Sequence, residues 1–324
     1  HWATSVLAHV SHFDNPLDHN EDGFIDDPLT TQYNLMNRWS YENDHVHSNI
    51  GINFLQEERK GGQEVYYDAT QKNGLYGIGI QTQRFQAFAK TGFSFHRPAT
   101  SLGLTATYSL HQQNSFYGNT SYDALQHSLY TKAVFQSFIG NTNHNYSAGL
   151  SYQYDKYDEN LNAQNLDRQE YVPGVFAQYT YKIPEKFTLI TGLRSDYNSY
   201  YGTLLTPRLH VKYMPDHQTT LRASGGKGYR AANVFIENTG ILASSRELVF
   251  HEDFDIEEAW NYGVNLTHIF HLPHHNELTL TADLYRTDFV NQVIVDREQS
   301  AREVHVYNLD GKSYSHSAQI EAST

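Results

Sequence analysis

The sequence contains no cysteine, so disulfide bonds, thiolate metal sites and redox chemistry at sulfur are excluded. The absence of cysteine does not decide in which cellular compartment the protein resides. It also lacks any run of about 18 apolar residues, which excludes a membrane-spanning helix. A transmembrane β-barrel is not excluded by this, because its strands need only about ten residues of which every second one is apolar.

Basic residues are few. Lys and Arg number 23 against 36 Asp and Glu, which gives a net charge of −13 with the two signs interspersed. Phosphate binding needs a basic stripe, and none is found, so nucleic acid is excluded as a partner.

Aliphatic residues for a conventional core are also scarce. Hydrophobic residues make up 39 % of the chain, below the about 45–50 % of globular proteins, yet aromatics reach 14 %, with 25 Tyr and 17 Phe. The chain therefore offers much amphipathic aromatic surface.

The main positive signal is a hydrophobic pattern of period two. Residues 260–267 place Trp, Tyr, Val and Leu alternately with polar residues or glycine, and similar runs occur at 102–110, 146–154 and 278–284. Such alternation predicts strands with one apolar and one polar face. The polar faces carry Arg208, His210, Lys212 and Arg222, which suits a wet or plugged lumen better than the core of a β-sandwich.

The lengths of the connections favour a barrel more strongly. About fourteen strands are expected, near 2–12, 31–42, 47–58, 79–95, 101–112, 124–139, 144–156, 169–183, 187–198, 204–214, 218–226, 259–271, 277–290 and 304–323. Short turns at 43–46, 97–100, 140–143, 184–185, 215–217 and 272–276 alternate with long connections at 13–30, 59–77, 113–122, 155–168, 227–258 and 291–305, with one compact exception at 199–203. Outer-membrane barrels have short turns at one end and long loops at the other, so the alternation predicts a transmembrane antiparallel β-barrel.

Several short stretches carry a resemblance to a known family. Residues 206–209 (TPRL) are followed by 221–233 (LRASGGKGYRAAN), 235–238 (FIEN), 258–263 (EAWNYG) and 285–293 (YRTDFVNQV). These resemble the barrel of TonB-dependent outer-membrane receptors, and residues 22–26 (DGFID) and 37–39 (NRW) are similar to receptors of Bacteroidota.

The resemblance implies a barrel of about 22 strands filled by an N-terminal plug. Residues 1–324 would then be part of one barrel domain, without the plug, the TonB box and the C-terminal strands. The chain also begins at His1 without a signal peptide, so we expect a longer full polypeptide.

The implied function is TonB-dependent import of a scarce nutrient across the outer membrane of a Gram-negative cell. Candidate cargoes are a metal chelate such as a siderophore complex, cobalamin, haem or copper. The implied partners are TonB–ExbB–ExbD through the missing plug, outer-membrane lipid and lipopolysaccharide, and a surface lipoprotein.

The first long connection resembles a calcium loop. Asp18, Asn20, Asp22 and Asp26 occupy the spacing of oxygen ligands, with Gly23 at the sharp turn and the carbonyl of Phe24 as a further ligand. The usual bidentate carboxylate at the last position is replaced by Leu29. The alternative interpretation is an acidic solvated turn.

Candidate ligand contacts lie near the long connections. Arg230 and Asn233 begin the longest one, where they are expected to contact a ligand or the plug, with pairing to a plug carboxylate as the alternative for Arg230. Tyr117, Tyr200 and Tyr201 offer aromatic faces for stacking. Of the 19 histidines, His19, His251 and His305 are expected in loops, with His12 and His111 close to them, where imidazole could bind haem or copper. The alternative for each is a solvated polar residue. His274 and His275 fall in a short turn.

No nucleophile elbow, phosphate loop or zinc-protease motif occurs, so we do not expect an enzyme. Two other classes stay open at this point. One is a passive porin or surface adhesin barrel, and the other is a soluble β-sandwich that serves as a binding module.

Overall fold

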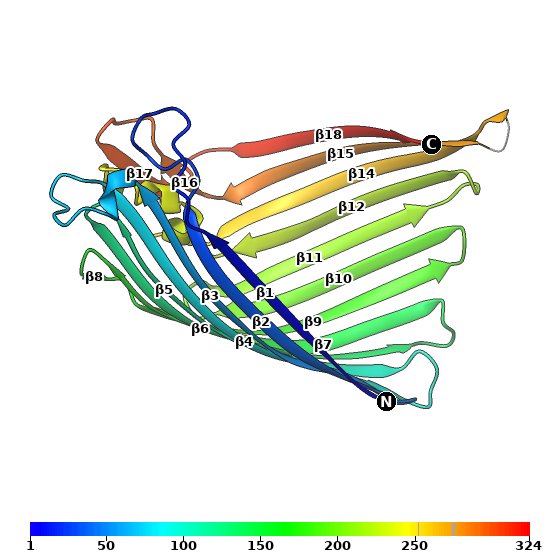
Figure 1. The fold of residues 1–324 in the computed structure, drawn as a ribbon. Coiled ribbons are helices and arrows are strands. Elements are labelled where there is room, and N and C mark those ends of the chain that lie inside the picture. The colour runs from blue at the N-terminus through cyan, green and yellow to red at the C-terminus, as the bar shows by residue number, and fades with distance from the viewer. Residues whose placement is uncertain (252, 274–275) are drawn as a thin grey trace.

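The computed structural model describes residues 1–251, 253–273 and 276–324, and these form a curved antiparallel sheet with loop structure at one end (Figure 1). Fourteen strands pair in chain order, each with the next, and the short β8 (Gln164–Asn165) pairs with β7 beside this path. The fourteen are β1 (Trp2–Phe13), β2 (Leu29–Glu42), β3 (Val46–Gly62), β4 (Gly77–Ser94), β5 (Ser101–Tyr117), β6 (Thr120–Phe138), β7 (His144–Leu161), β9 (Arg168–Ile183), β10 (Phe187–Asn198), β11 (Gly202–Tyr213), β12 (Thr219–Arg230), β14 (Glu257–His271), β15 (Glu277–Asn291) and β18 (Ser313–Ser323).

The two faces of the sheet follow from the alternation in the sequence, because successive side chains of a strand point to opposite faces. Leu150 of β7 lies directly opposite Val175 of β9, and both are more than half exposed on the convex face. The concave face carries polar side chains, among which Asp155, Glu159 and Asp196 are buried. The hydrophobic residues therefore point outwards, which is the reverse of a soluble protein.

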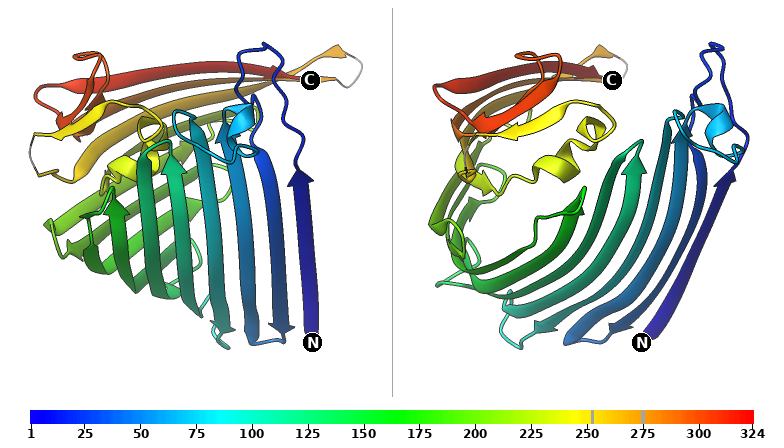
Figure 2. Two further views of the ribbon diagram at one scale, coloured as in Figure 1. Left: turned by 60° about the vertical axis from the view of Figure 1, so that its left-hand side comes forward. Right: turned by 90° about the vertical axis from the view of Figure 1, so that its left-hand side faces the viewer.

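The connections at one end of the sheet are short, and those at the other end are mostly long (Figures 1 and 2). The short turns predicted after β2, β4, β6, β9 and β11 are all present, and so is the compact turn between β10 and β11. The predicted turn at 272–276 also joins β14 to β15, but its residues His274 and His275 lie outside the described residues.

Three boundaries predicted from the sequence are wrong. The long connection expected at 155–168 is a short hairpin, because β7 continues to Leu161 and β9 begins at Arg168, with the short β8 between them. The long connection expected at 113–122 is a tight turn, because β5 and β6 continue to Tyr117 and from Thr120, and Gly118 supplies the positive φ of 60° that the turn needs. The strand expected over 304–323 is two strands, β17 (Glu303–Asn308) and β18. The break between them contains Gly311, whose φ is 128°.

Two long loops fold together beyond the ends of the strands. Loop 231–256 contains α1 (Val234–Glu237), η2 (Thr239–Ile241) and β13 (Glu247–Phe250), whereas loop 292–312 contains β16 (Val293–Asp296) and β17. These strands form a small separate sheet in the order β13-β17-β16, and β13 runs parallel to β17. A third loop, between β3 and β4, contains η1 (Glu64–Tyr66).

The helices of the described residues are short, and none of them has the length and apolar character needed to cross a membrane. Within residues 1–251, 253–273 and 276–324, no second sheet packs over the whole concave face of the main sheet (Figure 2), so the β-sandwich interpretation is not supported. Its two edge strands within the described part of the chain are β1 and β18.

Candidate ligand site on the concave face

Loop 231–256 folds back into the curve of the sheet and covers the strand ends there (Figure 2). Leu242 is 3 % exposed and packs in one hydrophobic cluster with Tyr117, Tyr122 and Leu161, the side chains at the tips of β5, β6 and β7. The Tyr76 hydroxyl donates a hydrogen bond to the Ala243 carbonyl at 2.9 Å, which ties the loop to the β3–β4 loop. The loop thus acts as a packed cover over this part of the concave face.

A buried polar group lies beside that cluster. The Tyr122 hydroxyl donates to Glu159 Oε1 at 2.7 Å, and both side chains are about 1 % exposed. Arg168 lies 4.0 Å from the same carboxylate, and its guanidinium is 4.1 Å from the centre of the Tyr157 ring. Because buried carboxylates are costly without partners, this arrangement fixes the tips of β6, β7 and β9 relative to one another.

A second buried group joins four strands lower on the concave face. Arg194 binds Asp196 with two hydrogen bonds of 2.6 Å and donates to Ser151 Oγ at 2.7 Å. The Tyr229 hydroxyl donates to the same Asp196 carboxylate at 2.7 Å. Gly174 leaves the room for this group, since a Cβ at that position would overlap the Asp196 carboxylate. The Tyr229 hydrogen bond therefore fixes the start of loop 231–256 to strand β10 of the main sheet.

Next to this group lies a cationic pocket, which we define by Lys132, Phe176, Arg194, Arg208 and Lys227. It has a volume of about 250 Å³ and is also lined by Thr206 and Gly192. Lys132 Nζ and the Arg194 guanidinium lie 5.0 and 5.7 Å from the centre of the Phe176 ring.

The four cations of the pocket differ in their partners. Arg194 is neutralised by Asp196, and Lys227 Nζ lies 2.5 Å from Glu258. Arg208 instead donates to the neutral amide of Gln178, and neither Arg208 nor Lys132 has an acidic partner among the ion pairs of the described residues. The pocket therefore presents two uncompensated positive charges beside an aromatic face, which suits an anionic ligand.

The ligand residues predicted from the sequence do not gather in one place. Arg230 is bound by Glu257 at 2.5 Å and by Glu237 at 3.2 Å, so its charge is already neutralised. Asn233 precedes α1, and its backbone N–H donates to Glu237. Tyr117 is buried at 6 % exposure beneath loop 231–256.

Tyr200 and Tyr201 form a separate pair in the turn between β10 and β11, with ring centres 6.4 Å apart. Tyr200 is 57 % exposed, and its hydroxyl accepts a hydrogen bond from the Gln169 N–H. Burial raises the pKa of Tyr201. This pair can offer a ring to a ligand that arrives at the long-loop end, and its role stays a prediction.

The loop predicted to bind calcium is closed by hydrogen bonds of its own. The two Asp18 carboxylate oxygens accept from the N–H groups of Asp22 and Gly23, and Asp22 accepts from Phe24 N–H. The His19 N–H and ring both bind Asp26, and they lower the pKa of that carboxyl.

Asn20 belongs to the same turn, since its side-chain oxygen accepts from Asp22 N–H and its amide donates to the Asp22 carboxylate. Within the described residues no group of three His, Asp or Glu side chains is placed to hold a metal ion. Calcium binding by this loop stays a prediction.

The predicted loop histidines have different surroundings. His19 is bound to Asp26, whereas His12 lies 3.3 Å from Asp14. His111 lies within β5. His251 and His305 meet, with Nε2 of the first 2.9 Å from Nδ1 of the second.

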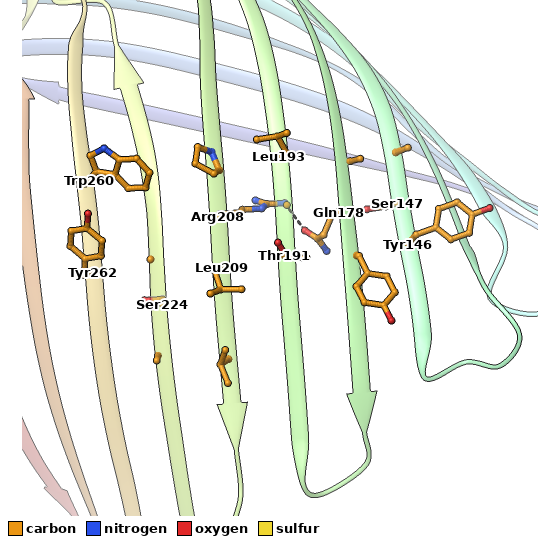
Figure 3. Close-up of a pocket in the computed structure, with 18 residues that line it drawn as sticks. Tyr146, Ser147, Gln178, Thr191, Leu193, Arg208, Leu209, Ser224, Trp260 and Tyr262 are labelled. Carbon is orange, nitrogen blue, oxygen red and sulfur yellow. Dashed lines mark hydrogen bonds between the residues drawn. The ribbon is translucent and has the colours of Figure 1, made fainter.

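The convex face is hollowed over β7 to β14 by an apolar groove (Figure 3). Leu193, Leu209 and Tyr262 line it and are each about half exposed, and the Trp260 and Tyr262 rings stack along β14 at 6.2 Å. A broad apolar surface on the outer side of a sheet is the surface that a barrel presents to lipid.

Sequence reasoning missed the pocket residues Lys132, Phe176 and Arg194. The one available signal was Arg194-Ser195-Asp196, since residues two apart on a strand share a face and opposite charges there can pair. The position of Lys132 across three strands from Arg194 depends on the pairing of those strands, which the sequence pattern does not give.

A curved antiparallel sheet with an apolar convex face, a polar concave face and long loops at one end is the wall of an outer-membrane type of β-barrel. Residues 8–323 match the family model described as TonB dependent receptor-like, beta-barrel. The chain therefore belongs to the TonB-dependent receptor β-barrel family. No curated protein matches it in a sequence comparison.

Solved structures share the fold at low identity. The copper transporter OprC has a TM-score of 0.73 at 10 % identity, over 98 % of this chain and 54 % of that one. A mutant of the ferric enterobactin receptor PfeA of Pseudomonas aeruginosa has 0.72 at 11 %, over 99 % and 54 %. The hemophore receptor HasR of Serratia marcescens, in complex with its hemophore and heme, has 0.70 at 13 %, over 98 % and 56 %. The chain thus spans about half the length of these receptors, and identities this low show the fold alone.

Proposed function

We propose that the chain forms part of the barrel of an active importer in the outer membrane of a Gram-negative cell, where TonB–ExbB–ExbD drives uptake through a plug outside this chain. Membership of the TonB-dependent receptor family supports this proposal, and so does the fold shared with receptors named for siderophores, heme and copper. In this setting the apolar convex face contacts lipid and lipopolysaccharide, and the long loops face the outside, where a surface lipoprotein could bind. The family consists of receptors, which favours transport over catalysis.

The cargo that we propose is an anionic metal chelate of the siderophore class. The observation that carries this is the cationic pocket, in which Lys132 and Arg208 lack acidic partners and Phe176 offers a ring face. Carboxylate and catecholate chelates carry negative charge, which charged donors bind most strongly, and the catechol rings can in addition stack on the Phe176 face. Neutral cobalamin, haem and copper are the alternative cargoes.

The test is uptake and binding by the full-length receptor with Lys132 and Arg208 both changed to Ala. A charge-assisted hydrogen bond contributes about 1.5–3 kcal/mol, so loss of either cation should weaken binding of an anionic chelate at least tenfold. The matched control is Lys212→Ala, because Lys212 lies on the same face of β11 four residues from Arg208 and outside the pocket.

Binding is measured by calorimetry with a panel of anionic ferric chelates and with cobalamin as the ligand without net negative charge. The proposal predicts that the double variant loses only the anionic ligands, whereas Lys212→Ala behaves as the wild type. Equal affinity of the wild type and the double variant for every anionic chelate in the panel would contradict it.

A further inference from the structure

Two histidines that are 54 residues apart in sequence meet where the two long loops join. His251 directly follows β13, and His305 lies in β17, with Val249 paired opposite His305 in the parallel register. The two rings are nearly parallel, at 25°, with centres 5.1 Å apart. Their facing nitrogens, Nε2 of His251 and Nδ1 of His305, are 2.9 Å apart.

Glu303 fixes the orientation of one of these rings. Its carboxylate lies 3.3 Å from Nε2 of His305, the nitrogen on the far side from His251. A carboxylate accepts hydrogen bonds, so it favours the tautomer of His305 with the proton on Nε2. The lone pair is then on Nδ1, directed toward His251. In the structure His251 Nε2–H then donates a hydrogen bond to this nitrogen. If the His251 proton moves to its Nδ1, a metal ion in place of the shared proton meets the lone pairs of both facing nitrogens.

We propose that His251 and His305 form a two-imidazole site for a divalent late first-row transition metal, with Cu²⁺ bound most tightly. A metal–imidazole bond is about 2.0–2.1 Å long, so two imidazoles at a right angle have nitrogens about 2.9 Å apart, and at a tetrahedral angle about 3.3 Å. The observed 2.9 Å is the length of the hydrogen bond that the two rings share without a metal, and small rotations of the rings would direct both lone pairs at one ion. Among divalent first-row metals imidazole sites bind Cu²⁺ most tightly. Glu303 is a positioning residue that acts through the ring of His305.

The small sheet keeps this pair facing outward. Val304 and Val306 are 1 % and 0 % exposed and anchor the other face of β17, whereas His251 is exposed and the His305 side chain is 14 % exposed, so the site opens to solvent on the His251 side. The Tyr307 ring meets that of His251 edge to face at 6.1 Å, and this contact limits rotation of the imidazole. Because no third His, Asp or Glu of the described residues completes the site, its other positions are left to water or to donor atoms of a chelator.

The metal would tie loop 231–256 to loop 292–312. In the structure β13 and β17 pair over only four residues, so a pair of metal–ligand bonds at the end of that pairing would add a strong local constraint. This site is separate from the cationic pocket and does not depend on the identity of the cargo.

The experiment is a Cu²⁺ titration of the full-length receptor in detergent, followed by electron paramagnetic resonance. The variants are His251→Ala, His305→Gln and Glu303→Gln, and the matched control is His217→Ala, in the turn at the opposite end of the sheet. We expect the wild type and His217→Ala to share one signal with two nitrogen ligands. Each change at His251 or His305 should abolish that signal and weaken the tightest binding at least tenfold, and Glu303→Gln should weaken it about tenfold with the signal retained.

A second readout tests the tie between the loops. Trypsin can cut after Arg246 and Arg302, one in each loop, and Cu²⁺ should slow both cuts in the wild type but not in the histidine variants. If His251→Ala and His305→Gln bind Cu²⁺ with the signal and affinity of the wild type, the proposal is wrong. The same holds if Cu²⁺ leaves both cleavage rates of the wild type unchanged.

Discussion

Replacing Asp196 with Ala tests whether the buried group on the concave face stabilises the barrel wall. Asp196 is 1 % exposed and accepts two hydrogen bonds of 2.6 Å from Arg194 and one of 2.7 Å from Tyr229. Removing one partner of a buried ion pair costs about 3–5 kcal/mol. The Arg194 side chain is 33 % exposed and can regain some hydration, so we expect a loss of about 2–3 kcal/mol.

The chain contains a matched control for this variant. Arg286 and Asp288 on β15 have the same spacing and the same 2.6 Å contact, but their side chains are 47 % and 38 % exposed. Because exposed pairs contribute about 0–1 kcal/mol, Asp288→Ala should change stability little.

The assay is guanidinium unfolding of the full-length receptor in detergent, followed by tryptophan fluorescence, with the free energy taken from the linear dependence on denaturant. Equal losses of stability in Asp196→Ala and Asp288→Ala would refute the argument, because they would show that burial adds nothing to this pair. Tyr229→Phe separates the contribution of the hydroxyl, with an expected loss of about 1 kcal/mol.

Three further predictions concern other parts of the chain. Gly174→Ala should cost about 1–3 kcal/mol in the same unfolding assay, because the added methyl group displaces Asp196. Leu242→Ala should destabilise the packing of loop 231–256 on the strand tips by about 2–3 kcal/mol, because it removes most of a buried side chain. Proteolysis within the loop should become faster, while the small sheet stays paired. The pKa of Asp26 is lowered by His19, so its stabilising contribution is complete above the usual value of 3.8 and is lost as the pH falls through the lower folded value. Hydrogen exchange of residues 14–28 should therefore stay slow down to about pH 4 and rise only below it.

Period-two alternation was sufficient to predict the strands, because the lipid-facing side of each strand needs apolar residues and the other side does not. The runs at 146–154 and 260–267 lie within β7 and β14, as predicted. The alternation gave a wrong prediction at 113–122, where polar residues such as Gln113 and Asn114 predicted a loop. These residues continue β5 beyond the apolar band, and a strand there no longer needs an apolar side.

The candidate site was predicted less well, since it depends on contacts between distant segments. Arg230 was expected to meet a ligand or the plug, yet Glu257, 27 residues later, pairs with it through the β12–β14 register. Tyr117 was expected in an open loop, but the fold of loop 231–256 buries it. His251 and His305 were singled out correctly as loop residues, although nothing in their spacing of 54 residues indicated that they touch.

The positions of the cover and the cationic pocket imply that capture and passage of a cargo use different residues. Tyr122, under loop 231–256, and Lys132, in the pocket, both lie on β6 and are ten residues apart, which is about 33 Å along a strand. A small chelate cannot touch both at once. In the proposed importer, a cargo that arrives at the long-loop end therefore meets Tyr200, Tyr201 and the cover first. Lys132 and Arg208, further along the strands, contact the cargo in a later step than these residues.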